Sequence, residues 1–260
     1  MIKYLGIFFG LIITIVFSCT SENSNNRGHL QVMLQDASAP FDSILINIQK
    51  FQIHPDIQSG DSSSGWLTLF DSPTTYNMVK LRNGIRTQLC NREIVGRTYK
   101  TIRLQLGACF AVRNDTLYNL EFWDESLKTM TIDSPIKVVN GQTTRALIDI
   151  NLYESISYVA DSSRFYFEPS FTFYYIDSTG GIEGHIIPKS DVYLTYGGDT
   201  LGMTTTESDN YFGFFGLLEG YYSIYIFPRD TANYRNWLVE NIPVHPDTSF
   251  DVGLIELPPR

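Results

Sequence analysis

Alternation of hydrophobic and polar residues dominates the chain from residue 29 onward. Leu30, Val32 and Leu34 share one side of a predicted strand, and polar Gln31 and Gln35 lie on the opposite side. The same period of two recurs over residues 42–54 and 101–106, whereas no long stretch repeats every 3.6 residues. The pattern therefore predicts half-buried β-strands and an all-β fold.

Turn residues punctuate these strands. Asn114-Asp115 separates two predicted strands and indicates a hairpin, because both residues tolerate the left-handed conformation. Asn83-Gly84 and Gly197-Gly198-Asp199 are turn signals of the same kind. Only residues 76–82 could form a helical turn or two.

The N-terminus carries an export signal. Lys3 is followed by an apolar run of about 15 residues, which is too short to cross a hydrocarbon core of about 30 Å comfortably. The run leads to Val16-Phe17-Ser18-Cys19, which resembles the lipobox of bacterial lipoproteins and would make Cys19 the acylated mature N-terminus. An ordinary secreted protein with a chance cysteine is the alternative.

The next segment predicts a spacer. Residues 20–28 contain no large apolar residue, and with Cys19 they indicate a flexible tether behind the signal peptide of residues 1–18. We therefore expect a lipid-anchored protein at the outer membrane. The periplasmic and surface-facing leaflets both remain open.

Composition and charge narrow the partners. The 260 residues are 43% hydrophobic and 14% aromatic but only 18% charged, which fits a globular, strand-rich chain. Lys and Arg total 19 against 28 Asp and Glu, giving a formal charge of −9. This balance disfavours a phosphate-binding surface, so nucleic acid is not an expected partner.

Two further cysteines follow Cys19. In an oxidising compartment we expect Cys90 and Cys109 to form a disulfide. The alternative is a pair of buried thiols in neighbouring strands. No C-x-x-C motif or Cys/His cluster occurs. The sequence therefore predicts no metal site.

Six motifs follow one another from residue 28 to residue 152: Gly28-x-Leu-x-Val, Asp36-Ala-Ser-Ala-Pro40, Trp66-Leu-Thr-Leu, Leu81-Arg-Asn-Gly84, Gly96-x-Tyr-x-x-Ile-Arg-Leu104 and Leu147-Ile-Asp-Ile-Asn-Leu152. Over residues 29–172 this series resembles a domain-of-unknown-function family found in Gram-negative lipoproteins. The resemblance implies an immunoglobulin-like β-sandwich behind a lipid anchor, here residues 29–175, and it brings no established active site.

Residues 176–260 show a second pattern, in which an acidic turn with an aromatic pair, Asp209-Asn210-Tyr211-Phe212, precedes Gly220-x-Tyr222. This pattern resembles the carboxypeptidase regulatory-like domain, a small transthyretin-like sandwich. Asn210 replaces the family's usual glycine, and asparagine tolerates positive φ. The resemblance implies an accessory module for display or docking, without a peptidase centre.

Signatures of catalysis do not appear. The chain has no H-E-x-x-H, G-x-S-x-G, Walker or calcium-loop motif, and its four histidines are scattered. We therefore expect no catalytic residue, no cofactor and no enzyme activity. An unrecognised hydrolase stays as an alternative, which would need acids or Ser/His side chains in one cleft.

Aromatic residues on the predicted strand 221–227 are the main candidates for contact. The inward positions are 222, 224 and 226, which leaves Tyr221, Tyr225 and Phe227 on the outer face. Packing against the first domain, a protein partner, or sugar rings could cover them. The expected function is an envelope binding, docking or structural module with a protein partner, and carbohydrate binding is the alternative.

Overall fold

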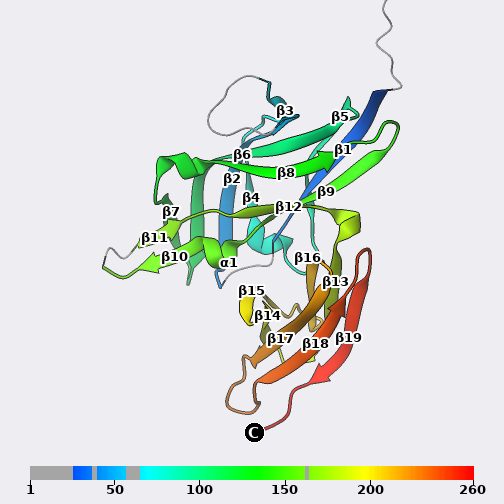
Figure 1. Cartoon of the computed structure of the whole chain (residues 1–260). Coiled ribbons are helices and arrows are strands. Elements are labelled where there is room, and N and C mark those ends of the chain that lie inside the picture. The colour runs from blue at the N-terminus through cyan, green and yellow to red at the C-terminus, as the bar shows by residue number, and fades with distance from the viewer. Residues whose placement is uncertain (1–25, 37–39, 57–64, 162–163) are drawn as a thin grey trace, which may run out of the picture.

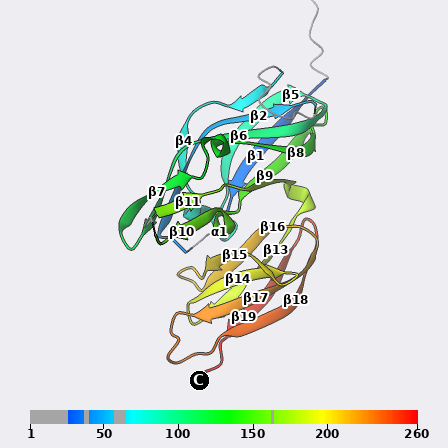
Figure 2. The same cartoon turned by 60° about the vertical axis from the view of Figure 1, so that its left-hand side comes forward.

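The computed structural model describes residues 26–36, 40–56, 65–161 and 164–260, and its strands form two β-sandwiches in succession (Figures 1 and 2). The expected all-β fold of consecutive sandwich domains is confirmed. The predicted signal peptide, Cys19 and tether residues 20–25 lie outside the described residues. Within the described ranges, no helix is long and apolar enough to span a membrane.

The N-terminal sandwich pairs a four-stranded sheet, in the order β12-β9-β1-β5, with an eight-stranded sheet. In the second sheet the order is β10-β11-β7-β6-β2-β3, with β4 on β2 and β8 on β6. The short helical elements are η2 (Met78–Leu81), η3 (Glu125–Lys128) and α1 (Leu152–Ser155). The strands are β1 (Arg27–Gln35), β2 (Ser43–His54), β3 (Leu67–Phe70), β4 (Thr74–Asn77), β5 (Thr87–Val95), β6 (Thr98–Arg113), β7 (Thr116–Phe122), β8 (Thr129–Lys137), β9 (Thr143–Ile150), β10 (Ile156–Val159), β11 (Arg164–Phe167) and β12 (Phe171–Tyr175).

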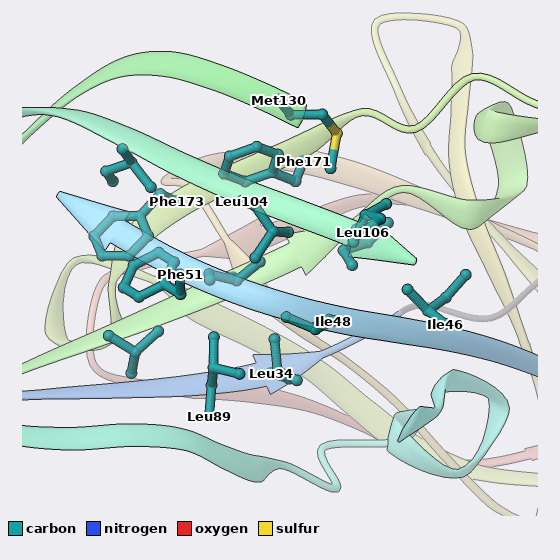
Figure 3. Close-up of a cluster of buried hydrophobic side chains, with 14 of the residues drawn as sticks. Leu34, Ile46, Ile48, Phe51, Leu89, Leu104, Leu106, Met130, Phe171 and Phe173 are labelled. Atoms are coloured by element: carbon teal, nitrogen blue, oxygen red, sulfur yellow. The ribbon is translucent and has the colours of Figure 1, made fainter. Parts of the chain in front are cut away.

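The core of this sandwich lies between the two sheets. Leu34 of β1 is fully buried, as the alternation predicted, and so is Phe51 of β2. Figure 3 shows the Phe51 ring beside Phe173 of β12, and the two rings stack with centroids 6.3 Å apart. Burying each such side chain stabilises the fold by roughly 1.5–3 kcal/mol, so this interior holds the sheets together.

The C-terminal sandwich follows after the short helical turn η4 (Ile176–Ser178). Its sheets have the orders β16-β13-β19 and β15-β14-β17-β18, and they enclose a second hydrophobic cluster that includes Phe212 and Ile224. The strands are β13 (Gly180–Ile187), β14 (Ser190–Tyr196), β15 (Asp199–Thr205), β16 (Tyr211–Leu217), β17 (Gly220–Pro228), β18 (Trp237–Val244) and β19 (Ser249–Glu256).

The predicted turns occur where the sequence placed them. Asn114 and Asp115 connect β6 to β7 with φ values of 50° and 58°. Asn210 has a φ of 69°, so asparagine does take the glycine conformation there. Asn83 and Gly84 also have positive φ, directly after η2.

The prediction of a disulfide between Cys90 and Cys109 is wrong, because both residues are free thiols in the structure. Cys90 lies in β5 and Cys109 in β6, which belong to different sheets of the sandwich. Stacked sheets pack about 10 Å apart, whereas a disulfide needs Cα atoms closer than about 7 Å. Both thiols are buried, although their strands are not paired with each other.

These thiols should be unreactive in the folded protein. Burial raises the pKa of Cys90 to about 12 and that of Cys109 to about 11, which removes nearly all thiolate at pH 8. In a Cys19→Ser variant we expect alkylation to be about 100-fold slower in the native state than in urea. Mass spectrometry after timed quenching would measure this, and rapid labelling of either native cysteine would contradict it.

Candidate functional site

The C-terminal sandwich covers part of the outer face of the four-stranded sheet. Along β9, Ile148 points into the N-terminal core, whereas Leu147 and Asp149 point the other way. Leu147 is fully buried against the second sandwich, where a Cβ on Gly216 would lie 2.9 Å from Leu147 Cδ2. In both Figure 1 and Figure 2 the C-terminal sandwich lies at the end of the N-terminal sandwich opposite β1's first residue.

Asn83 makes the most extensive polar contact between the sandwiches. Its Nδ2 donates to Glu207 Oε1 (2.9 Å) and to the Thr205 carbonyl (3.2 Å). Its Oδ1 accepts from Thr204 Oγ1 (2.6 Å) and from the Gly213 backbone N–H (3.1 Å). An amide side chain has two donors and two acceptor positions, so Asn83 uses its whole capacity on the C-terminal sandwich.

Glu207 also accepts a hydrogen bond from Arg82, the residue that follows η2. Arg82 Nε lies 3.0 Å from Glu207 Oε1. Burial acts to raise the pKa of Glu207, but the hydrogen bonds and charge of Arg82, helped by Asn83, hold it below its usual value. The carboxylate is therefore charged at neutral pH and fixed by two residues of the other domain.

A second contact lies at the end of β1. Gln35 Nε2 donates to the Phe215 carbonyl at 2.7 Å, and Arg86 Nε donates to Gln35 Oε1 at 2.8 Å. The Phe215 ring packs so closely on Gly84 that a Cβ there would lie 2.7 Å from a ring carbon. Together with Asn83, these contacts fix the relative placement of the two sandwiches.

Beside these contacts lies a hollow of about 450 Å³, which we call the interdomain cleft. Its carboxyl groups are Asp36, Asp149, Glu154 and Glu219, and no Lys, Arg or His is among the described residues that line it. Its tyrosines are Tyr153, Tyr174, Tyr196 and Tyr222.

Asp149 is the most perturbed group in the interdomain cleft. Its Oδ1 is buried and has no hydrogen-bond partner. Burial raises the pKa of this carboxyl from 3.8 to about 7, because a desolvated carboxylate is unfavourable. Part of the population is therefore protonated at neutral pH.

A second surface, the aromatic patch, is made of the half-buried Tyr193 on β14 and the exposed Tyr225 and Phe227 on β17. Tyr193 lies directly opposite Tyr225 in the sheet, and its ring meets Phe227 edge-on with centroids 5.3 Å apart. With Thr195 and Thr200 these residues border a shallow hollow of about 370 Å³.

The predicted contact residues are indeed on the outer face of β17. Tyr221 is 68% exposed, Tyr225 42% and Phe227 39%, so the N-terminal sandwich does not cover them. Packing against the first domain is therefore wrong as their explanation, and a protein partner or sugar rings remain. Tyr225 and Phe227 border the hollow, whereas Tyr221 does not.

Comparison with known protein families identifies the family of the N-terminal sandwich. The family model described as "Domain of unknown function (DUF4382)" matches residues 27–169, which is more than half of the chain. The chain belongs to this family. The match to DUF4382 includes Asn83 and Asp149 but ends before the C-terminal sandwich, and its description assigns no activity.

Comparison with curated proteins found no match. Among solved structures, the Bacillus anthracis TIE protein is 9% identical, with 89% of this chain and 34% of that chain covered and a TM-score of 0.24. This chain thus spans about a third of the TIE protein. GBS52, the minor pilin of Streptococcus agalactiae, is 11% identical with 87% and 94% covered and a TM-score of 0.23. BcpA, the major pilin subunit of Bacillus cereus, is 8% identical with 89% and 99% covered and a TM-score of 0.23. At these scores the likeness carries no functional argument.

Three residues of the DUF4382 chain matter more than the sequence indicated. Alternation in residues 190–196 would have placed Tyr193 on the same outer face as Tyr225. Asn83 was predicted only as a turn residue, and Asp149 only as part of a motif.

For the described residues, no group of three or more His, Cys, Asp or Glu side chains could hold a metal ion.

Proposed function

We propose that this chain is a non-catalytic, lipid-anchored protein of the cell envelope that binds an envelope protein through its aromatic patch. Acylated Cys19 would hold it at the outer membrane, and the tether would separate the folded part from the bilayer. In this proposal the DUF4382 domain is an immunoglobulin-like support, and the C-terminal sandwich is a transthyretin-like docking module.

The aromatic patch is the observation that carries the proposal. Tyr225 and Phe227 expose 42% and 39% of their surface beside Tyr193, although the outer face of a sandwich strand is normally polar. Aromatic rings grouped in this way are enriched at the centres of protein interfaces. The ion pair between Arg229 and Asp191, at 3.2 Å, lies beside Phe227 in the sheet and supplies a polar edge.

A photo-crosslinking amino acid at Tyr225 tests the partner. We expect one discrete envelope protein to be captured in intact cells. Leu117 is the matched control, because it is a 61% exposed apolar residue on β7 of the other sandwich. Equal capture from both positions, or none from Tyr225, would contradict the proposal.

The double variant Tyr225→Ala/Phe227→Ala should weaken binding of the captured partner about 30-fold, as expected for removing interface hot spots. Its free energy of unfolding should fall by about 1–2 kcal/mol, because 42% of Tyr225 and 39% of Phe227 is exposed and the rest packs on neighbouring side chains. Surface plasmon resonance and urea unfolding would measure the two effects.

Anchoring is tested separately by the Cys19→Ala variant. Without an acylated cysteine, the protein should move from the membrane fraction to the soluble fraction and lose palmitate labelling. Retention of both properties would overturn the anchoring part of the proposal.

Carbohydrate binding is the second candidate, favoured by the hydroxyls of Thr195 and Thr200 beside the tyrosine rings of the shallow hollow. A glycan array would decide between the two candidates. Binding of one glycan class that disappears in Tyr225→Ala, without a crosslinked protein, would establish the carbohydrate function instead.

A further inference from the structure

We infer that the interdomain cleft is a second binding site, and that its ligand is a small organic cation with a primary ammonium group. The cleft and the shallow hollow of the aromatic patch share no lining residue, although they adjoin where the Tyr153 ring meets the Tyr193 ring edge-on with centroids 6.3 Å apart. The residues that carry the inference are therefore different from those that carry the proposed docking function.

The charge of the cleft selects a cation. Both sandwiches contribute carboxyl groups: Asp36 directly after β1, Asp149 on β9 and Glu154 on α1 come from the N-terminal sandwich, and Glu219 before β17 comes from the C-terminal sandwich. The described lining residues include no Lys, Arg or His, although His245, outside the lining, lies 3.2 Å from Glu219. A hollow with low-dielectric walls and one sign of charge concentrates ions of the opposite sign.

Asp149 indicates where the cation binds. Its Oδ1 is buried in the lining of the cleft and has no hydrogen-bond partner in the folded protein. A buried carboxylate without a partner is costly, and an ammonium group would supply both the missing donor and the compensating charge.

Aromatic rings make the site suitable for an organic cation. The Tyr196 and Tyr222 rings lie 5.0 Å apart at 42°, and the Tyr222 hydroxyl already donates to the Leu218 carbonyl at 2.9 Å. Ring faces attract ammonium groups, and this attraction increases in a desolvated site. The volume of about 450 Å³ lies within the usual range of small-molecule pockets, roughly 300–1,000 Å³.

A metal ion fits the cleft less well. A divalent cation needs several ligands at about 2.0–2.6 Å from one point, whereas no group of three suitable side chains is found among the described residues.

The surroundings of Asp149 define its pH dependence. Gln35 of β1 and Thr172 of β12 are its neighbours in the sheet, and neither titrates. Asp36, Glu154, Glu219 and the four tyrosines are the titratable residues of the cleft. Two basic residues outside the lining are paired with acids. His245 lies 3.2 Å from Glu219, and Arg145 of β9 pairs with Asp177. Burial alone raises the pKa of Asp149 to about 7.

Calorimetric titration of the purified full-length protein with alkyl mono-, di- and triamines tests the inference, with 1,4-diaminobutane as the reference and 1,4-butanediol as its neutral analogue. The diamine should bind at pH 8 and the diol should not. Affinity should be about tenfold lower at pH 6, where a carboxyl with a pKa of about 7 is only about one-tenth ionised.

The Asp149→Asn variant should bind the diamine at least about tenfold more weakly at pH 8, because a charge-assisted hydrogen bond is lost. Its remaining affinity should not change between pH 6 and pH 8. Asp115→Asn is the matched control, since it makes the same chemical change in the exposed β6–β7 turn. Circular dichroism and thermal unfolding would show that both variants fold.

Each contrary result overturns the inference. Equal binding of the diol would indicate a neutral polyol ligand, and unchanged diamine binding in Asp149→Asn would place the amine elsewhere. No binding of any amine at about 10 mM would exclude an ammonium site. None of these results affects the aromatic patch, so this inference and the proposed function fail separately.

Discussion

Replacing Asn83 by alanine should uncouple the two sandwiches. The variant loses four hydrogen bonds to the C-terminal sandwich and leaves Thr204 Oγ1 and the Gly213 N–H without their acceptor. At about 0.5–1.5 kcal/mol per bond, we expect a loss of about 3 kcal/mol in unfolding free energy. Calorimetry should show one unfolding transition for the native protein and two for the variant, and limited proteolysis should cleave the variant near residues 176–179.

Asn114→Ala is the control for this prediction. Asn114 has nearly the same positive φ, 50° against 56° for Asn83, but it lies in the exposed β6–β7 turn. This variant should lose only the tolerance of asparagine for positive φ, which lowers the unfolding free energy by about 1 kcal/mol. It should keep one unfolding transition. Equal effects of the two variants would mean that backbone strain, and not the interdomain hydrogen bonds, explains the loss.

The Asp149→Asn variant should be more stable than the native protein at pH 8, by about 2 kcal/mol. The folded pKa of about 7 lies above the unfolded value near 3.8, so the folded state binds the proton more tightly. The favourable contribution of the protonated form is fully present below about pH 4 and is lost as pH rises to 7. A pKa shift from 3.8 to about 7 corresponds to about 4 kcal/mol of unfolding free energy. The expected gain is smaller, because the side-chain oxygen of the asparagine is also left without a hydrogen-bond partner.

Urea unfolding at pH 4 and pH 8 would measure this difference. We expect the gain of Asp149→Asn at pH 8 and almost none at pH 4, whereas Asp115→Asn should show no such dependence. A destabilised Asp149→Asn at pH 8 would mean that the carboxylate has a partner in solution. A destabilising group retained in a cleft is consistent with the common trade-off between stability and binding.

The strands of this protein could be predicted from sequence because each sheet has one buried face. Alternation in β1 and β17 identified the residues that enter the core, and asparagine or glycine marked the turns. These features depend on neighbouring residues only. They required no knowledge of how distant segments pair.

The interdomain cleft could not be predicted in the same way. Leu147 and Asp149 lie on the side of β9 that faces away from the N-terminal core. Leu147 is buried where Gly216 of the second sandwich packs on it, and Asp149 lines the cleft. The pairing of Cys90 with Cys109 failed for a similar reason, because spacing in the sequence does not reveal which sheet a strand joins. Both depend on contacts between segments far apart in the chain.

The position of β1 has a mechanical consequence. This first strand of the folded part lies inside its sheet, with β5 antiparallel on one side and β9 parallel on the other. Under the proposed anchoring, tension from the membrane enters at Arg27 and runs along the strand, while the C-terminal sandwich lies at the opposite end (Figure 1). Such a load shears both hydrogen-bond ladders together and cannot open them one pair at a time. The first domain would therefore unfold slowly under force and act as a load-bearing link between the bilayer and whatever the C-terminal sandwich holds.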